Sequence, residues 1–272
     1  MSIRQRFRCR STWVAALWVA APVLAIAAPA PAPRPDGEVL RVLVVPDGTR
    51  SEFVSAEPKA VNPGFERELL EGFAKSRKRH VEVTGAKSWD DLVPALEEGR
   101  GDLIAGHFTR TADREQHMTF TDGILPTRTV VITRKPRPAV ITLEELRKVK
   151  IGAVKASASL ESLQDAGVPP AHITEGTQEE MVDLLRSGKV DAIARAAPLA
   201  ILNQREDPAL QLGVFVGPPS QFAWGVRKSD TALRDALNEH LQLARRTGAW
   251  NRLVVKYFGQ AAIEILKQAE SR

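Results

Sequence analysis

The chain has 272 residues, of which 43% are hydrophobic and 26% charged, with 38 basic and 33 acidic side chains and a net charge of +5. These ordinary globular proportions exclude a disordered, collagen-like or fibrous chain and allow one large domain or two small ones. The basic excess would suggest a nucleic-acid or membrane-surface partner, but most of it comes from the first ten residues.

The first 27 residues have the pattern of a secretory signal peptide. Four arginines occur within the first ten residues, and an uncharged, largely apolar run follows over residues 11–33. Ala25 and Ala27 supply the small residues of a cleavage site, so we expect cleavage after Ala27. Cleavage would leave a net charge of +1, which argues against a nucleic-acid partner. The alternative is an uncleaved membrane anchor over residues 12–28.

The only cysteine, Cys9, lies in the basic segment ahead of the apolar run. The mature chain would therefore have no thiol, which excludes disulfides, thiolate catalysis and cysteine-metal sites. Residues 28–37 are rich in alanine and proline, so we expect a semi-extended linker there. The fold is expected to begin at residue 38.

Short apolar runs alternate with amphipathic segments along the rest of the chain. In the first part, this periodicity predicts strands at residues 40–45, 81–84 and 102–106 and helices at residues 64–76 and 89–98. In the middle, it predicts strands at residues 129–133, 149–154 and 190–194 and helices at residues 143–148, 159–166 and 178–187. Near the C-terminus, it predicts a strand at residues 222–226 and helices at residues 230–246 and 250–257.

Strands that alternate with helices indicate a mostly parallel α/β sheet with binding sites at the carboxyl ends of its strands. The apolar runs at residues 129–133 and 222–226 are suited to cross between two lobes. We therefore predict that residues 38–131 plus 222–272 form one lobe and that residues 132–221 form a second lobe inserted into it.

Eight short strings follow one another at residues 40–42, 64–69, 89–96, 99–104, 109–114, 120–122, 188–192 and 256–259. In their order and spacing they resemble the extracytoplasmic solute-binding proteins of family 3, the polar amino-acid type. No single string is specific, but together they cover almost the whole mature chain. The resemblance implies a two-lobed periplasmic-binding-protein fold of type II, with a ligand cleft between lobes joined by two crossing strands.

Within that family, four strings resemble the binding module of the membrane-bound lytic murein transglycosylases F. They lie at residues 98–104, 109–111, 203–205 and 208–210. In such enzymes a transglycosylase domain follows the module, whereas here 13 residues follow Gly259. We therefore expect the module without the enzyme.

The resemblance places a ligand between the lobes and makes Arg114 its first candidate contact. A guanidinium binds a carboxylate through two hydrogen bonds and keeps its charge at physiological pH. Thr109 matches a hydroxyl or backbone donor of the same cradle. From the residues alone, Arg114 could instead be a surface residue at the start of a helix capped by Thr111.

Other candidates of the first lobe have an equally simple structural explanation. His107 stands two residues before Thr109, where the family has a small residue, and a lone histidine is often structural. Asp47 and Phe53 match a polar and an aromatic position after the first strand, but they also suit a turn residue and a core residue. Trp89 begins an amphipathic segment, and we expect it to pack in the core rather than contact the ligand.

In the inserted lobe, residues 155–159 occupy the place of the family's Gly-Thr-Ser loop. The backbone amides of that loop lie at a helix N-terminus and suit an anionic group. Ser157 keeps the hydroxyl of the family pattern, and Ala158 follows it in the loop. Ala156 replaces a glycine, which limits how closely the loop approaches a ligand.

The acid that pairs with an α-ammonium in this family is missing, because Ala196 stands at its position with Arg195 beside it. An early aromatic is replaced by Arg50. An unpaired ammonium would cost about 1–3 kcal/mol on burial. This pattern favours an anionic ligand, such as a carboxylate-bearing metabolite or a cell-wall peptide fragment. There are two alternatives. Either Arg114 or Arg195 points to solvent, or Asp47 pairs with a ligand ammonium in place of the missing acid.

Three functions follow from the resemblance. The first is a monomeric periplasmic protein that captures a small carboxylate-bearing ligand, an amino acid or related metabolite, for an ABC-type permease. The second is a sensing module that binds cell-wall peptide fragments or amino acids and regulates a cell-wall enzyme in the inner membrane. The third is an enzyme of the same fold, such as a cyclohexadienyl dehydratase.

The sequence gives the enzyme little support. Its five histidines are dispersed, and it has neither a Gly-x-Ser-x-Gly elbow nor a phosphate-binding loop. We therefore expect a binding protein with no catalytic residue, no metal and no cofactor.

Overall fold

The computed structural model describes residues 39–45 and 64–271, which lie within the compact unit Pro33–Arg272. Several expectations fall outside the described residues and stay predictions. They are the leader at residues 1–27, the linker at residues 28–37, and the side chains of Cys9, Asp47, Arg50 and Phe53.

The first of two sheets in the described part of the chain holds the N-terminal strands. Its spatial order is β2 (His80–Gly85), β1 (Val39–Val44), β3 (Leu103–Ile104), β10 (Gly225–Val226) and β4 (Thr119–Phe120). β1 pairs in parallel with β2 and β3, whereas β10 is antiparallel to β3 and β4. The carboxyl ends of β1, β2 and β3 therefore lie at one edge, where the chain leaves β3 for the candidate site.

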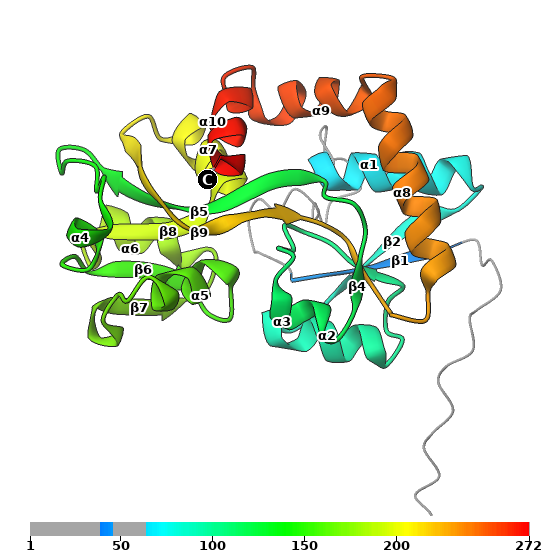
Figure 1. Cartoon of the computed structure of the whole chain (residues 1–272), viewed down its shortest axis with the longest axis horizontal. Helices are drawn as coiled ribbons and strands as arrows, with labels where there is room; N and C mark the ends of the chain where they lie inside the picture. Colours follow the sequence, from blue (N-terminus) through cyan, green and yellow to red (C-terminus); the bar gives the residue numbers. More distant parts are fainter. Residues whose placement is uncertain (1–38, 46–63, 272) are drawn as a thin grey trace, which may run out of the picture. The chain divides into compact units, whose positions relative to one another are not determined.

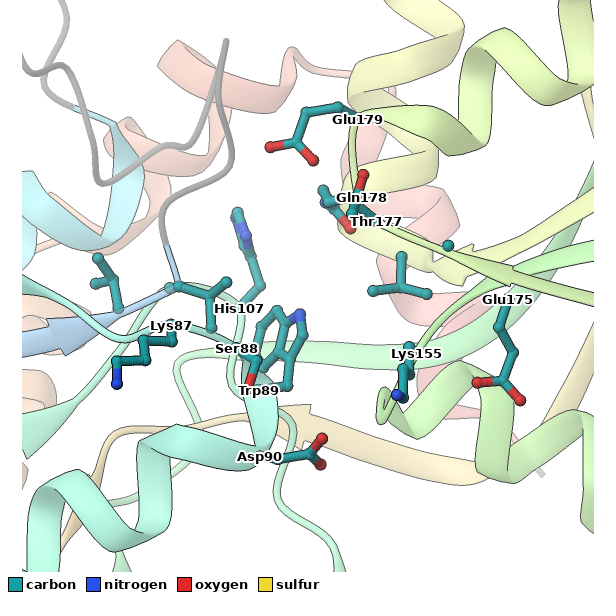
Figure 2. Close-up of a pocket in the computed structure, with 15 residues that line it drawn as sticks. Lys87, Ser88, Trp89, Asp90, His107, Lys155, Glu175, Thr177, Gln178 and Glu179 are labelled. Atoms are coloured by element: carbon teal, nitrogen blue, oxygen red, sulfur yellow. The ribbon is translucent and has the colours of Figure 1, made fainter.

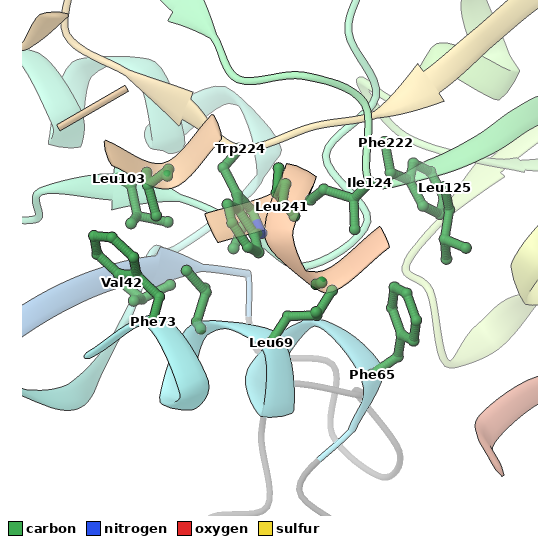
Figure 3. Packing of buried hydrophobic residues seen from close by; sticks show 14 of the residues in the cluster. Val42, Phe65, Leu69, Phe73, Leu103, Ile124, Leu125, Phe222, Trp224 and Leu241 are labelled. Carbon is green, nitrogen blue, oxygen red and sulfur yellow. The ribbon is translucent and has the colours of Figure 1, made fainter. Parts of the chain in front are cut away.

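Alternating side chains of β1 enter two different cores, as a strand's pleat requires. Val42 packs in a cluster with residues of α1 (Phe65–Ser76), α8 (Thr231–Arg246) and α9 (Ala249–Phe258). Trp224, which is fully buried, lies in the same cluster (Figure 3). Leu43 packs on the other face, against α2 (Trp89–Glu97). The first sheet is thus covered by helices on both faces.

The second sheet has the spatial order β7 (Ile173–Gly176), β6 (Ile151–Val154), β8 (Ala192–Ala196), β5 (Leu125–Arg134) and β9 (Leu210–Phe222). β6 is parallel to β7 and β8, and β5 is antiparallel to β8 and β9. Its helices are α4 (Leu143–Leu146), α5 (Ala158–Asp165), α6 (Glu180–Arg186) and α7 (Ala197–Glu206), with a short 3-10 turn, η1, at Pro170–His172.

Two long paired strands connect the sheets. The chain passes from β4 of the first sheet into β5, and it returns through β9 into β10 (Figure 1). These crossings replace the short strands expected at residues 129–133 and 222–226. Two mixed sheets with helices and two connecting strands confirm the expected two-lobed α/β fold. The lobe boundaries at residues 131 and 221 stay a prediction.

The periodicity did not predict β7, most of β9, α7 or the final helix, α10 (Ala262–Glu270). α10 packs against β5, β9 and α7. Its Leu266 belongs to the cluster around α1, whereas its Ala269 belongs to a cluster of the second sheet. Among residues 39–45 and 64–271, no helix combines the length and the apolar character needed to cross a membrane.

The start of α2 is held by one carboxylate. Asp91 accepts hydrogen bonds from the backbone N–H of Lys87 at 2.9 Å and from Nη2 of Arg100 at 2.6 Å. The hydrogen bond from Arg100, followed by that from Lys87, lowers the pKa of Asp91 to about 2. Trp89, two residues before Asp91, begins this helix and is oriented by it.

We predict that Asp91→Asn destabilises the protein at neutral pH but not in acid. A carboxyl group whose pKa is lowered on folding adds stability above its unfolded pKa, about 3.9, and this stability is lost as the pH falls toward 2. Urea unfolding at a series of pH values should therefore show a difference from wild type that shrinks below about pH 4. Glu97→Gln, an exposed change on the same helix, is the control. A difference that is independent of pH would contradict this role.

Candidate functional site

Three adjoining pockets lie between the two sheets. Their volumes are about 40, 370 and 650 Å³, and His107 and Gln178 line all three. We call the smallest the inner compartment and the 370 Å³ pocket the outer chamber. Six of the eight residues selected by the resemblance line the inner compartment: His107, Thr109, Arg114, Ser157, Ala158 and Arg195. The other two, Asp47 and Phe53, lie outside the described residues, and ligand contact by all eight stays a prediction.

Arg114 is held against aromatic rings at the edge of the inner compartment. It lies in the short helix α3 (Ala112–Glu115), which Thr111 caps by accepting a hydrogen bond from the Arg114 N–H at 3.4 Å. Nη1 of Arg114 donates to the carbonyl of Thr109 at 2.7 Å. Its guanidinium carbon lies 4.1 Å from the ring centroid of Phe108. Arg114 thus follows the helix cap expected from the sequence and also lines the pocket, and its contact with a ligand stays a prediction.

Desolvation lowers the pKa of Arg114 to about 10, against the opposing effect of the negative charges of Glu161 and Asp113. The group stays protonated at neutral pH, so the fold keeps a positive charge in a partly dehydrated place. In the described part of the chain, no carboxylate forms a salt bridge with it. A partly buried cation of this kind is stabilised by an anion that enters the compartment.

The N-terminus of α5 faces the same compartment. The hydroxyl of Ser157 caps this helix by accepting the Leu160 N–H at 3.2 Å, which leaves its own hydrogen to be donated. The Ser159 hydroxyl is buried and accepts a hydrogen bond from Thr129. Amides in the first turn have no acceptor within a helix, so those of Ala158 and Ser159 can bind a ligand oxygen.

Arg195 and Ala196 close the inner compartment from β8. Arg195 is 6% exposed, and its Nη1 donates to Oδ1 of Asn203 at 2.8 Å. It therefore does not project into solvent, which removes one of the alternatives left by the sequence. Among the described residues that line the compartment there is no aspartate or glutamate.

His107 has an unusual backbone that a buried acid supports. Its φ is 62°, in the left-handed region that favours glycine, and Gly106 before it has φ 85°. The Glu66 carboxylate accepts the N–H of His107 at 2.6 Å and that of Gly106 at 3.1 Å. It also accepts the indole N–H of Trp224 at 3.2 Å. Glu66 thus joins α1 and the core to the loop that places His107 in the cleft.

The outer chamber has apolar walls and a charged rim. Val44, Val45, Trp89 and Val154 supply apolar surface. Lysines and acids surround it: Lys87, Asp90, Lys155, Glu175 and Glu179. Figure 2 shows Gln178 and Glu179 on the opposite side of this space from Lys87 and His107.

Trp89 and Gln178 line the site, although the sequence did not select them. Trp89 does pack, as expected, because its ring stacks on Phe108 with a centroid distance of 6.4 Å and packs against clusters of both sheets. It also lines both the inner compartment and the outer chamber. Gln178 lies in a polar loop before α6, where the sequence carries no signal for a pocket residue. No group of three or more potential metal ligands occurs among the described residues.

Glu66→Gln should destabilise the protein. The carboxylate accepts three buried N–H groups, and the NH₂ of the glutamine would face at least one of them donor to donor. We expect the free energy of unfolding to fall by about 1–3 kcal/mol. Glu71→Gln, on the same helix, breaks only a partly exposed ion pair with Arg67 and should cost less than about 1 kcal/mol. Denaturant unfolding measures both, and equal losses in the two variants would contradict the role of Glu66.

Comparisons with known proteins agree with this geometry. A 28% identical region of 200 residues occurs in a membrane-bound lytic murein transglycosylase F of Desulfosudis oleivorans, covering 72% of this chain and 44% of that protein. The chain thus spans less than half of that relative. A probable histidine-binding protein of Neisseria gonorrhoeae is 28% identical over 246 residues, covering 86% of this chain and 90% of the relative.

A similar fold occurs in the crystal structure of an ancestral amino-acid-binding protein described as a precursor of cyclohexadienyl dehydratase. The TM-score is 0.72 at 23% identity, and the match covers 81% of this chain and 96% of that one. The model of the bacterial extracellular solute-binding proteins, family 3, matches residues 40–260. This chain therefore belongs to family 3 of the bacterial extracellular solute-binding proteins.

Proposed function

We propose that this chain is a periplasmic binding protein that captures a small carboxylate-bearing ligand, an amino acid or a related anionic metabolite, between its two lobes. The observation that carries the proposal is the partly dehydrated Arg114, which has no carboxylate partner in the described part of the chain and lies beside the N-terminus of α5. A carboxylate there would accept hydrogen bonds from a guanidinium and from first-turn amides.

The two sides of the proposed site come from different lobes. Thr109 and Arg114 follow the first sheet, whereas Ser157 and Arg195 belong to the second. A ligand that bridges them stabilises the closed arrangement by its differential affinity for the closed over the open state. A membrane partner then recognises the closed, ligand-bound form.

We assign the partner as an ABC-type permease. The relative described as a probable histidine-binding protein is matched over nearly its whole length, which supports a free-standing binding protein. The leader expected at residues 1–27 would direct the chain to the periplasm. The similarity to lytic murein transglycosylase F supports a second candidate, a sensing module that regulates a cell-wall enzyme. We propose no catalysis, because the residues around Arg114 are suited to binding an anion.

Arg114→Ala should weaken ligand binding strongly while the protein stays folded. Removing one partner of a desolvated charge pair costs 2 kcal/mol or more, which is about a 30-fold loss of affinity. Arg114→Lys keeps the charge but loses the planar pair of donors, so its loss should be intermediate. The measurement is a thermal-shift screen against amino acids, dicarboxylates and short peptides, followed by calorimetry of any hit.

Arg110→Ala is the matched control. Arg110 lies four residues before Arg114 in the chain, is half-exposed and pairs with Glu115 outside the pocket. The Arg110→Ala variant should bind the ligand as tightly as the wild-type protein does. A ligand that binds Arg114→Ala as tightly as wild type would refute the carboxylate site.

A further inference from the structure

The charged residues that line the inner compartment differ from those that line the outer chamber. Arg114 and Arg195 line the inner compartment, and its described lining contains no carboxylate. The acids Asp90, Glu175 and Glu179 line the outer chamber instead. A bound molecule therefore meets the Arg114 guanidinium at its inner end, and carboxylates among the lining residues only beyond that compartment.

This division disfavours a free α-ammonium. In an α-amino acid the ammonium is on the carbon next to the carboxylate, so it would enter the region of Arg114 and Arg195 with the carboxylate. There it would meet the like charge of Arg114 and the methyl group of Ala196, with no carboxylate among the described lining residues. Like charges in a partly dehydrated place repel strongly. A nitrogen at this position is better tolerated when it carries no charge.

The size of the two pockets also separates the two ends of a ligand. A volume of about 40 Å³ in the inner compartment accommodates a group of the size of a carboxylate. The rest of the molecule must extend past Trp89 and Gln178, which line both pockets, into about 370 Å³ bounded by Val44, Val45 and Val154. A volume in this range is typical of a site for a complete organic ligand.

Gln178 stands at the junction with a suitable pair of hydrogen-bonding groups. Its side chain is partly buried and points into the cleft in Figure 2, and no hydrogen bond joins it to another described residue. A glutamine offers both a carbonyl acceptor and an NH₂ donor. An amide group of a ligand is complementary to it, because its N–H and its carbonyl each find a partner.

We propose that the ligand is a carboxylate whose neighbouring nitrogen forms an amide, as in an N-acylated amino acid or the C-terminal end of a short peptide. This inference rests on the proposed function, since it assumes the carboxylate at Arg114. The amide lies beside Gln178 and Ala196, and the acyl group or preceding residue lies against Trp89 and Val154 in the outer chamber. Gln178 and Ala196 are thus specificity-determining residues.

The first experiment compares three forms of the same panel of amino acids by calorimetry on the mature protein. The forms are the free amino acid, its N-acetyl derivative and its alanyl dipeptide. We expect the amide-containing forms to bind about tenfold more tightly than the free form, or better. The N-acetyl and dipeptide arms distinguish an acylated amino acid from a peptide as the source of the amide.

The outcomes separate the inference from the proposed function. Free amino acids that bind at least as tightly as their N-acetyl forms, and depend on Arg114, overturn the amide and leave the carboxylate site standing. If no form binds, the proposed function fails and the inference fails with it.

Two variant pairs test the assigned residues. Ala196→Asp supplies an acid beside the expected nitrogen, so it should raise the affinity ratio of free to N-acetyl amino acid by about tenfold or more. Ala196→Asn has the same shape without the charge and should leave the ratio near the wild-type value. Gln178→Leu should weaken amide-containing forms more than free ones. Gln164→Leu, the same change at an exposed position of α5 that lines none of the three pockets, should not. If the affinity ratio of free to N-acetyl amino acid is unchanged in both Ala196→Asp and Gln178→Leu, these two residues do not determine specificity. Melting curves establish that each variant is folded.

Discussion

The buried carboxylate of Glu66 connects the fold to its cleft. It is 1% exposed and accepts hydrogen bonds from two consecutive backbone amides after β3 and from the indole of Trp224. Those amides belong to Gly106 and His107, both of which have positive φ. A non-glycine residue in this conformation is held there by its surroundings. The cleft therefore has its shape because α1, the core tryptophan and the loop after β3 share one acceptor.

From that loop the chain continues directly into residues that line the inner compartment. Residues 108–110 are held against the end of β9 and the residues after it, through the bridge between Thr109 and Phe222 and a hydrogen bond from Ala223 to Phe108. The carbonyl of Thr109 then fixes Arg114. Since β9 is one of the two strands that connect the sheets, the arginine lies close to a connection between them.

Hydrophobic periodicity was sufficient for the elements with a clear apolar face. α1 and α2 were predicted because their apolar residues recur at the helical period, and β1 because it is a short, continuous apolar run. β7 was missed because none of its residues is fully buried, and β9 because Gly217, Pro218 and Pro219 interrupt its apolar pattern. A strand at the sheet edge tolerates proline, since one of its sides needs no partner. α7 was not predicted because its polar and apolar residues do not separate into two faces.

The site could be predicted only through the family. Composition and spacing left Arg114 as a helix-start residue, and the motif alone singled it out. Trp89 and Gln178 are 89 positions apart in the chain, and only the packing of the two sheets brings them to one cavity. The absence of an acid at Ala196 was visible in the sequence, but its meaning depends on Arg195 being buried beside it.

If Arg114 holds a ligand carboxylate, as we propose, affinity must depend on the charge of the ligand. The measurement is the calorimetric affinity of the tightest-binding acid found for this protein and of its primary carboxamide, which has nearly the same shape and no charge. We expect the carboxamide to bind at least about 30-fold more weakly, because a desolvated charge pair is lost. Equal affinities for the acid and the carboxamide would contradict it.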